Sequence, residues 1–124
     1  MLGAWSGRPV LRARSAGMVT AELAVAIPAV VVVLAICLGG IALGIDQIRC
    51  VDAARLGARA LARGDANPAV REVVTRAAPV AARISVNDGG SEARVTVTVH
   101  RSVLGLAHGF DVTATSVADR EQDP

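Results

Sequence analysis

Aromatic side chains are almost absent from this chain of 124 residues, which has one Trp, one Phe and no Tyr although 52% of its residues are hydrophobic. Alanine and valine supply most of the apolar content. The composition therefore excludes a core of bulky aromatic residues. Much of the hydrophobicity lies in one long segment, as it does in membrane proteins. The length allows one domain at most beside such a segment.

Lysine is absent as well, so all thirteen basic residues are arginines, and with eleven acidic residues the formal net charge is +2. Arg8, Arg12 and Arg14 precede the first acidic residue. Beyond residue 17, ten arginines remain against eleven acidic residues, a formal balance of −1. This balance disfavours a nucleic-acid-binding surface and confines the excess of positive charge to an N-terminal tail, a pattern typical of targeting signals.

The chain also lacks the sequence motifs of common active sites. It contains no HExxH, no GxSxG and no glycine-rich phosphate loop. The only histidines are His100 and His108, with Ser102 and Asp111 near them in sequence. We interpret both histidines as exposed structural residues. We therefore expect a protein that is not an enzyme and that has no metal ion and no cofactor.

The two cysteines, Cys37 and Cys50, are thirteen residues apart. On one continuous helix this separation is about 20 Å along the axis. A disulfide requires Cα atoms within about 7 Å of each other, so the two thiols cannot form a bond within one chain. Because the spacing is also not CxxC, we expect both to be packing residues.

No charged residue occurs between Glu22 and Asp46, and the apolar segment between them, Leu23–Ile45, reads LAVAIPAVVVVLAICLGGIALGI. As a helix it spans about 35 Å, which is enough to cross a hydrocarbon core of about 30 Å. The sequence therefore predicts a transmembrane helix at 23–45. The N-terminal arginines place the N-terminus in the cytoplasm and the C-terminal part outside.

An ordinary secretory signal peptide is the main alternative interpretation, with Ala42-Leu43-Gly44 as its cleavage site. The apolar core of such a peptide has about 7–15 residues, and this segment is longer.

Glu22 lies at the edge of the apolar segment, where a carboxylate is costly unless it has a partner. It is the fifth residue counted from Met18, and Gly17 precedes Met18 after the basic leader. Pro28 follows six residues after Glu22. One interpretation of Glu22 is a helix N-terminal acid in the headgroup region, which the helix dipole favours.

The order of basic leader, Gly17, Glu22 and apolar segment resembles the class III signal of type IV pilins and pseudopilins. With Pro28 and the continuation DQIRCVDAARLGARALARGD, residues 16–66 look like the TadE-like minor pilins of the tight-adherence system. The resemblance implies that a prepilin peptidase cleaves between Gly17 and Met18. It also implies that Glu22 and Pro28 act in assembly, with Glu22 neutralising the new amine of Met18 in a neighbouring subunit.

Beyond residue 45 the pattern predicts an amphipathic continuation of the helix to about residue 63, with Asp46–Arg49 and Asp52–Arg55 as ion pairs. Its apolar stripe is expected to dock a small head or a neighbouring subunit; the stripe consists of Val51, Ala54, Ala58 and Leu61. Gly64 is expected to end this helix.

The predicted head covers 64–124. Its expected elements are a helix with Asn67 as N-cap and Pro68 in the first position, a strand at 83–86, a turn at 87–90, a strand at 94–99 and a third strand at about 110–118. The fold class is therefore α+β, a long N-terminal helix followed by a small head with a short antiparallel sheet.

The resemblance implies a TadE-like minor pilin, or pseudopilin, in which 1–17 is the leader, 18–63 the long helix and 64–124 the exported head. Its partners would be the lipid bilayer of the inner membrane, prepilin peptidase and other pilin subunits. The alternative is a single-pass, membrane-anchored binding or sensor module that is exported and not cleaved.

Overall fold

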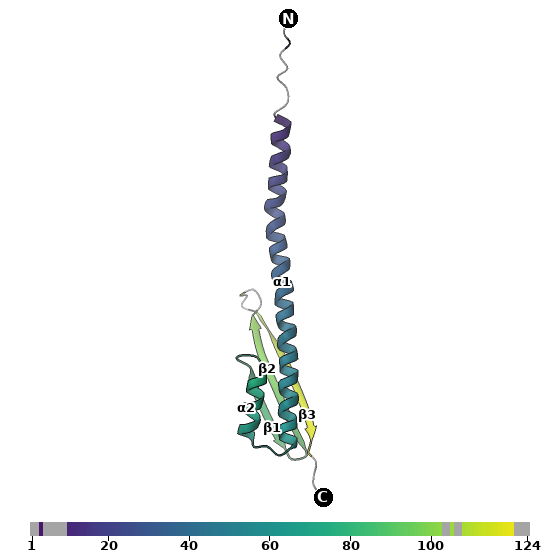
Figure 1. The fold of residues 1–124 in the computed structure, drawn as a ribbon, viewed down its shortest axis with the longest axis vertical. Coiled ribbons are helices and arrows are strands. Elements are labelled where there is room, and N and C mark those ends of the chain that lie inside the picture. Colours follow the sequence, from purple (N-terminus) through teal and green to yellow (C-terminus); the bar gives the residue numbers. More distant parts are fainter. Residues whose placement is uncertain (1–2, 4–9, 103–104, 106–107, 121–124) are drawn as a thin grey trace. The chain divides into compact units, whose positions relative to one another are not determined.

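The computed structural model describes residues 3, 10–102, 105 and 108–120, and the side chains of 10–13 lie outside this description. The fold is α+β, with two helices followed by three strands (Figure 1). The chain divides into two compact units, Met1–Cys37 and Leu38–Pro124. The second unit contains the end of the long helix and the whole head.

The long helix α1 covers Val10–Ala62, 53 residues, and continues through Pro28. It begins before Met18, where the long helix was expected to start, because residues 10–17 contain no proline and mostly good helix formers. It ends as a Schellman motif: the N–H of Gly64 donates to the carbonyl of Leu61, and the N–H of Asp65 donates to that of Ala60. Gly64 has a φ of +85°, so the expected glycine stop is confirmed.

A three-stranded antiparallel sheet of order β1-β2-β3 forms the head. Its strands are β1 (Arg83–Gly89), β2 (Glu92–Ser102) and β3 (Gly109–Asp119). Side chains on one face are buried and those on the other face are exposed, which explains the alternation of valine with polar residues along β2. Threonine pairs cross the exposed face, Thr96 with Thr115 and Thr98 with Thr113.

The hairpin turn is shorter than the sequence predicted. The expected turn at 87–90 is wrong, because Asn87, Asp88 and Gly89 continue β1 and the last strand pair is Gly89 with Glu92. The loop therefore consists of Gly90 and Ser91. Two-residue hairpin loops need a positive φ, and Gly90 provides one of +70°.

The helix α2 (Asn67–Ala77) also begins differently from the prediction. Its N-cap is Ala66, whose carbonyl accepts a hydrogen bond from the N–H of Val70, and no side chain caps it. The expected cap by Asn67 is wrong, because the first helical hydrogen bond already reaches Ala66 and Asn67 lies inside the helix. Pro68 is tolerated there because no helical partner is needed for a backbone N–H in the first turn.

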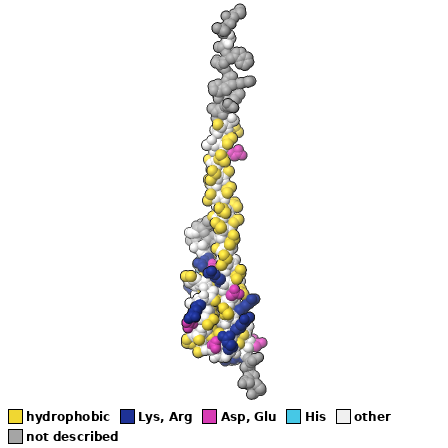
Figure 2. All heavy atoms as spheres, in the orientation of Figure 1, with side chains coloured by type: hydrophobic (Ala, Val, Ile, Leu, Met, Phe, Trp, Pro, Cys, Tyr) yellow, Lys and Arg dark blue, Asp and Glu magenta, His cyan; other side chains and the backbone are white. Residues whose placement is uncertain are grey.

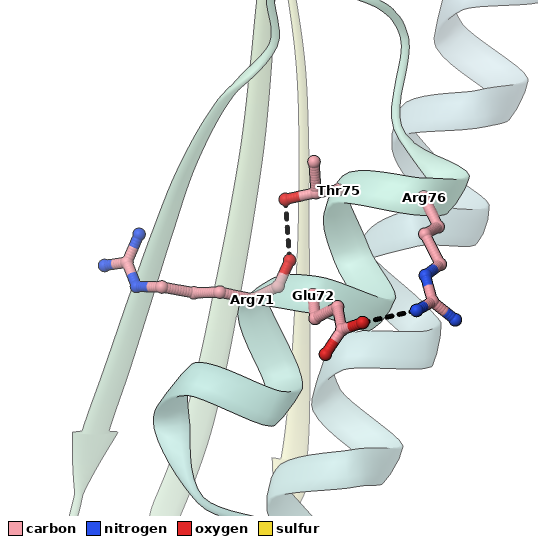
Figure 3. Close-up of polar contacts among 4 residues, drawn as sticks. All are labelled: Arg71, Glu72, Thr75 and Arg76. Atoms are coloured by element: carbon pink, nitrogen blue, oxygen red, sulfur yellow. Dashed lines mark hydrogen bonds and ion pairs between the residues drawn. The ribbon is translucent and has the colours of Figure 1, made fainter.

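Polar side chains stabilise α2 on its outer side (Figure 3), and one of them also connects the helix to the sheet. The expected i,i+4 pair of Glu72 and Arg76 is present, and the hydroxyl of Thr75 donates to the carbonyl of Arg71 at 2.7 Å. The guanidinium of Arg71 donates to the carbonyl of Ile84 at 3.2 Å. This last bond connects α2 to β1, the strand beside it.

The head packs against the C-terminal part of α1, where small residues allow a close approach. The core joins this part of α1 to α2 and to the buried face of the sheet; its fully buried members include Cys50, Ala53, Ala60, Leu61, Val70, Val74, Val95 and Val97. Along the predicted stripe, Ala54, Ala58 and Leu61 are buried and Val51 is partly buried. The expectation that this stripe docks the head is therefore confirmed.

Gly57 lies at the closest point of this packing. A Cβ atom there would be 2.6 Å from Cγ2 of Val74 and 3.0 Å from Cγ1 of Val95. A side chain at position 57 therefore has no room unless both valines move.

We predict that Gly57→Ala lowers the free energy of unfolding by about 1–3 kcal/mol, because overpacking outweighs the better helix propensity of alanine. Denaturant unfolding in detergent micelles measures this change. Gly44→Ala is the matched control, since a Cβ on Gly44 meets no atom within 4 Å and lies in the same helix. Equal stability of the two variants would show that Gly57 is not a contact point.

Candidate functional site

The residues of the predicted cleavage and assembly site lie on α1, in the unit Met1–Cys37. Gly17, Met18, Glu22 and Pro28 are all exposed, and Met18 is 74% exposed. Met18 and Glu22 are four residues apart, so their side chains project from the same face one helical turn from each other. A Cβ on Gly17 would meet no atom within 4 Å, and the bond between residues 17 and 18 lies inside the continuous helix α1.

Most side chains of the apolar segment are exposed in the described chain, and Leu43 near its end packs against the core. Within the described residues, one helix is long and apolar enough to cross a membrane, and none of its most apolar window is buried. Figure 2 shows apolar side chains over the visible face of this helix. The exposed members include Leu23, Val25, Ile27, Val30, Val31, Val32, Val33, Leu34, Ile36, Leu38 and Ile41. Such a helix is compatible with a single-pass membrane anchor.

The first charged residue after the apolar segment, Asp46, is bound by an arginine of the head. Nε of Arg101 donates to Oδ2 of Asp46 at 2.6 Å, and a guanidinium N–H donates to Oδ1 at 3.2 Å. Asp46 is only 5% exposed. A buried carboxylate needs such a bidentate partner, because an unpaired one would be strongly destabilising.

This Asp46–Arg101 pair replaces the expected pair of Asp46 with Arg49, and no ion pair links Asp52 with Arg55 among the described residues. Both expectations considered only the helix itself. The hydrogen bond with Asp46 raises the pKa of Arg101 above its usual value. A sequence signal for the pair did exist: Arg101 continues the inward positions of Val95, Val97 and Val99, where an unpartnered charge would be costly.

Cys50 lies one helical turn after Asp46 and is fully buried. Burial raises the pKa of its thiol, the nearby carboxylate of Asp46 raises it further, and Arg101 partly opposes this effect. Since the thiolate is the reactive form, Cys50 is an inert packing residue. Both cysteines are free thiols, and Cys37 is exposed. Both lie on the continuous helix α1, which is the arrangement from which the absence of an intrachain bond was expected.

His100 pairs with Asp111 on the exposed face of the sheet. Nδ1 of His100 lies 2.6 Å from Oδ1 of Asp111, its partner across β2 and β3, but both side chains are about two-thirds exposed. Among the described residues, Ser102 makes no hydrogen bond to His100, and His108 is exposed. No group of three His, Cys, Asp or Glu residues in the described part of the chain is placed to hold a metal ion.

A curated mycobacterial protein is similar to this chain over most of the length of both proteins. The Mycobacterium tuberculosis protein named apoptosis inhibitor Rv3655c is 39% identical over 100 residues, which cover 81% of this chain and 77% of that protein. No family model matches the sequence, and no solved structure does.

We predict that Cys50 reacts with a water-soluble maleimide roughly 100-fold more slowly than an exposed thiol, since labelling requires an opening that costs about 3 kcal/mol. The comparison uses Cys37→Ala for Cys50 alone, and Cys37→Ala with Cys50→Ala and Ser91→Cys for a thiol in the exposed hairpin loop. Rates are measured with and without denaturant. Burial raises the pKa of the Cys50 thiol in the folded protein. The labelling rate of Cys50 should therefore reach its plateau at a higher pH than the labelling rate of the exposed thiol. Equal rates in native protein would contradict the buried position.

Proposed function

The chain belongs to the same family as the Mycobacterium tuberculosis protein named apoptosis inhibitor Rv3655c, and we propose that it is a structural subunit, a TadE-like minor pilin or pseudopilin of a tight-adherence, type IV pilus-like system. The observation that carries the proposal is Glu22, exposed one helical turn after Met18 at the edge of the apolar segment. In this account a prepilin peptidase cleaves between Gly17 and Met18.

Assembly is favoured because the carboxylate of Glu22, at the edge of the membrane, has no ion-pair partner among the described residues of its own chain. Cleavage creates a positive α-amine at Met18, and the carboxylate of Glu22 lies about 6 Å further along the helix axis, so a modest axial offset between neighbouring subunits brings the two charges to the same depth. Within a bundle of subunits, Glu22 of one chain neutralises the Met18 amine of the next. Each charge then has a partner in a lipid environment where an isolated charge costs on the order of a few kcal/mol.

The exposed apolar segment supports the same function. Its side chains pack against lipid while the subunit is in the membrane and against the helices of other subunits after assembly. The proposed location is the inner membrane, with the N-terminus in the cytoplasm and the head outside, because the unopposed arginines all precede the segment. Proposed partners are the bilayer, prepilin peptidase and other pilin subunits.

The name of the relative favours a second candidate. That name describes inhibition of apoptosis and does not mention assembly. A chain with such a role would act through its head as a single-pass, exported binding or sensor module, and its N-terminus would not be cleaved. The two candidates differ in the first residue of the mature chain, Met18 in one and near Met1 in the other.

We predict that Glu22→Gln, which removes the charge and keeps the shape, leaves membrane insertion and leader removal intact but abolishes recovery of other pilin subunits. Glu22→Asp should be intermediate, because its charge remains but reaches one methylene less far. The N-terminus of each purified chain is determined by mass spectrometry, and co-purified pilins are quantified beside it.

Thr20→Val is the matched control on the same helix, because it removes only the hydrogen bond that the hydroxyl donates to the carbonyl of Ala16 at 2.9 Å. Normal recovery of pilins with Glu22→Gln would exclude the charge pairing. It would leave Glu22 as an ordinary interfacial carboxylate. The interpretation of Glu22 as a helix N-terminal acid is not supported, because α1 begins at Val10 and its first turn contains no acidic residue. An uncleaved wild-type chain would favour the second candidate.

A further inference from the structure

Phe110 is an exposed aromatic residue next to the end of the apolar segment. The chain has two aromatic residues, and Phe110 is the one in the described part. It is 60% exposed although it lies at an inward position of β3, where Val112 and Ala114 further along are buried. The core ends before it, so its ring finds no cover within the described part of the head.

The Asp46–Arg101 pair fixes where Phe110 lies. Phe110 is the partner of Arg101 across β2 and β3, so the two side chains lie on the same face of the sheet, with Cα atoms about 5 Å apart. Arg101 in turn binds Asp46, the residue directly after the apolar segment. β2 therefore ends, and β3 begins, beside the point on α1 where the apolar segment ends (Figure 1).

We propose that Phe110 is an interfacial anchor that inserts its ring into the lipid surface at the end of the membrane-spanning helix and so holds the head against the bilayer. The partner is the headgroup and upper acyl region of a phospholipid membrane. A boundary at Asp46 puts Phe110 at this depth, where aromatic rings are favoured because their apolar body leaves water while the nearby chain stays hydrated.

A lipid surface fits Phe110 better than a water-exposed position does. A single exposed apolar residue is ordinary on a soluble protein. Here the neighbouring charge, Arg101, binds Asp46 at the end of the apolar segment and its side chain is 42% exposed, so it lies at the proposed membrane boundary. Phe is one of the apolar residues that interfacial segments bury at the boundary of headgroups and acyl chains, with arginine among the polar residues beside them.

The proposal rests on the membrane anchor included in the proposed function, and single-tryptophan variants of the full chain test the two separately. In a Trp5→Phe background, Leu34→Trp places the probe at the middle of the span, Phe110→Trp at the anchor and Val117→Trp at the far end of β3. Val117 is exposed and lies about 23 Å along the strand from Phe110. Each variant is reconstituted in phosphatidylcholine vesicles with acyl chains brominated at different depths.

The expected result is that Phe110→Trp shows blue-shifted emission and is quenched most by the shallowest bromines, at a depth of about 5–10 Å below the headgroups. Leu34→Trp should be quenched most by the deepest bromines. Val117→Trp should show the emission of a water-exposed tryptophan and no quenching by bromines at any depth. Quenching of Leu34→Trp with no quenching of Phe110→Trp would overturn the anchor at Phe110 while the span stands. Loss of quenching at Leu34→Trp would overturn the span itself and the anchor with it.

Discussion

The Asp46–Arg101 pair is the contact on which the arrangement of the second unit depends. Asp46 is buried at the end of the apolar segment, and its two oxygens are satisfied by one guanidinium from the end of β2. Without Arg101 the carboxylate would be buried and unpaired, a strongly destabilising state. The pair therefore joins two points 55 residues apart, the end of the apolar segment on α1 and the end of the central strand β2.

Small side chains set the second constraint. The chain has too few aromatic residues for a bulky core, so it buries valine, alanine and leucine by bringing backbones close together. Gly57 is the position where α1 meets both α2 and β2, and the alanines around it keep the helix surface smooth. The C-terminal part of α1 thus belongs to the head, while the apolar segment stays available to lipid or to other helices.

Patterns within single elements predicted the α+β class, the long helix, the glycine stop and a three-stranded antiparallel sheet. Contacts between elements were harder to predict from the sequence. The i,i+3 rule assigned Arg49 to Asp46, but the fold brings Arg101 closer, since tertiary burial outweighs a weak pair on a helix surface. The hairpin turn lies at residues 90–91 and not at the predicted 87–90. The reason is local: the two-residue loop requires a positive φ, and Gly90 supplies it. The proposed cleavage and assembly roles depend on partner proteins.

A double-mutant cycle at Asp46 and Arg101 tests most directly whether one ion pair fixes the head to the end of the apolar segment. The free energy of unfolding is measured for the wild type, Asp46→Asn, Arg101→Met and the double variant in the same detergent. We predict a coupling energy of about 1–3 kcal/mol between the two positions. Effects that add to within about 0.3 kcal/mol would contradict the account, because residues that do not interact are additive at this level.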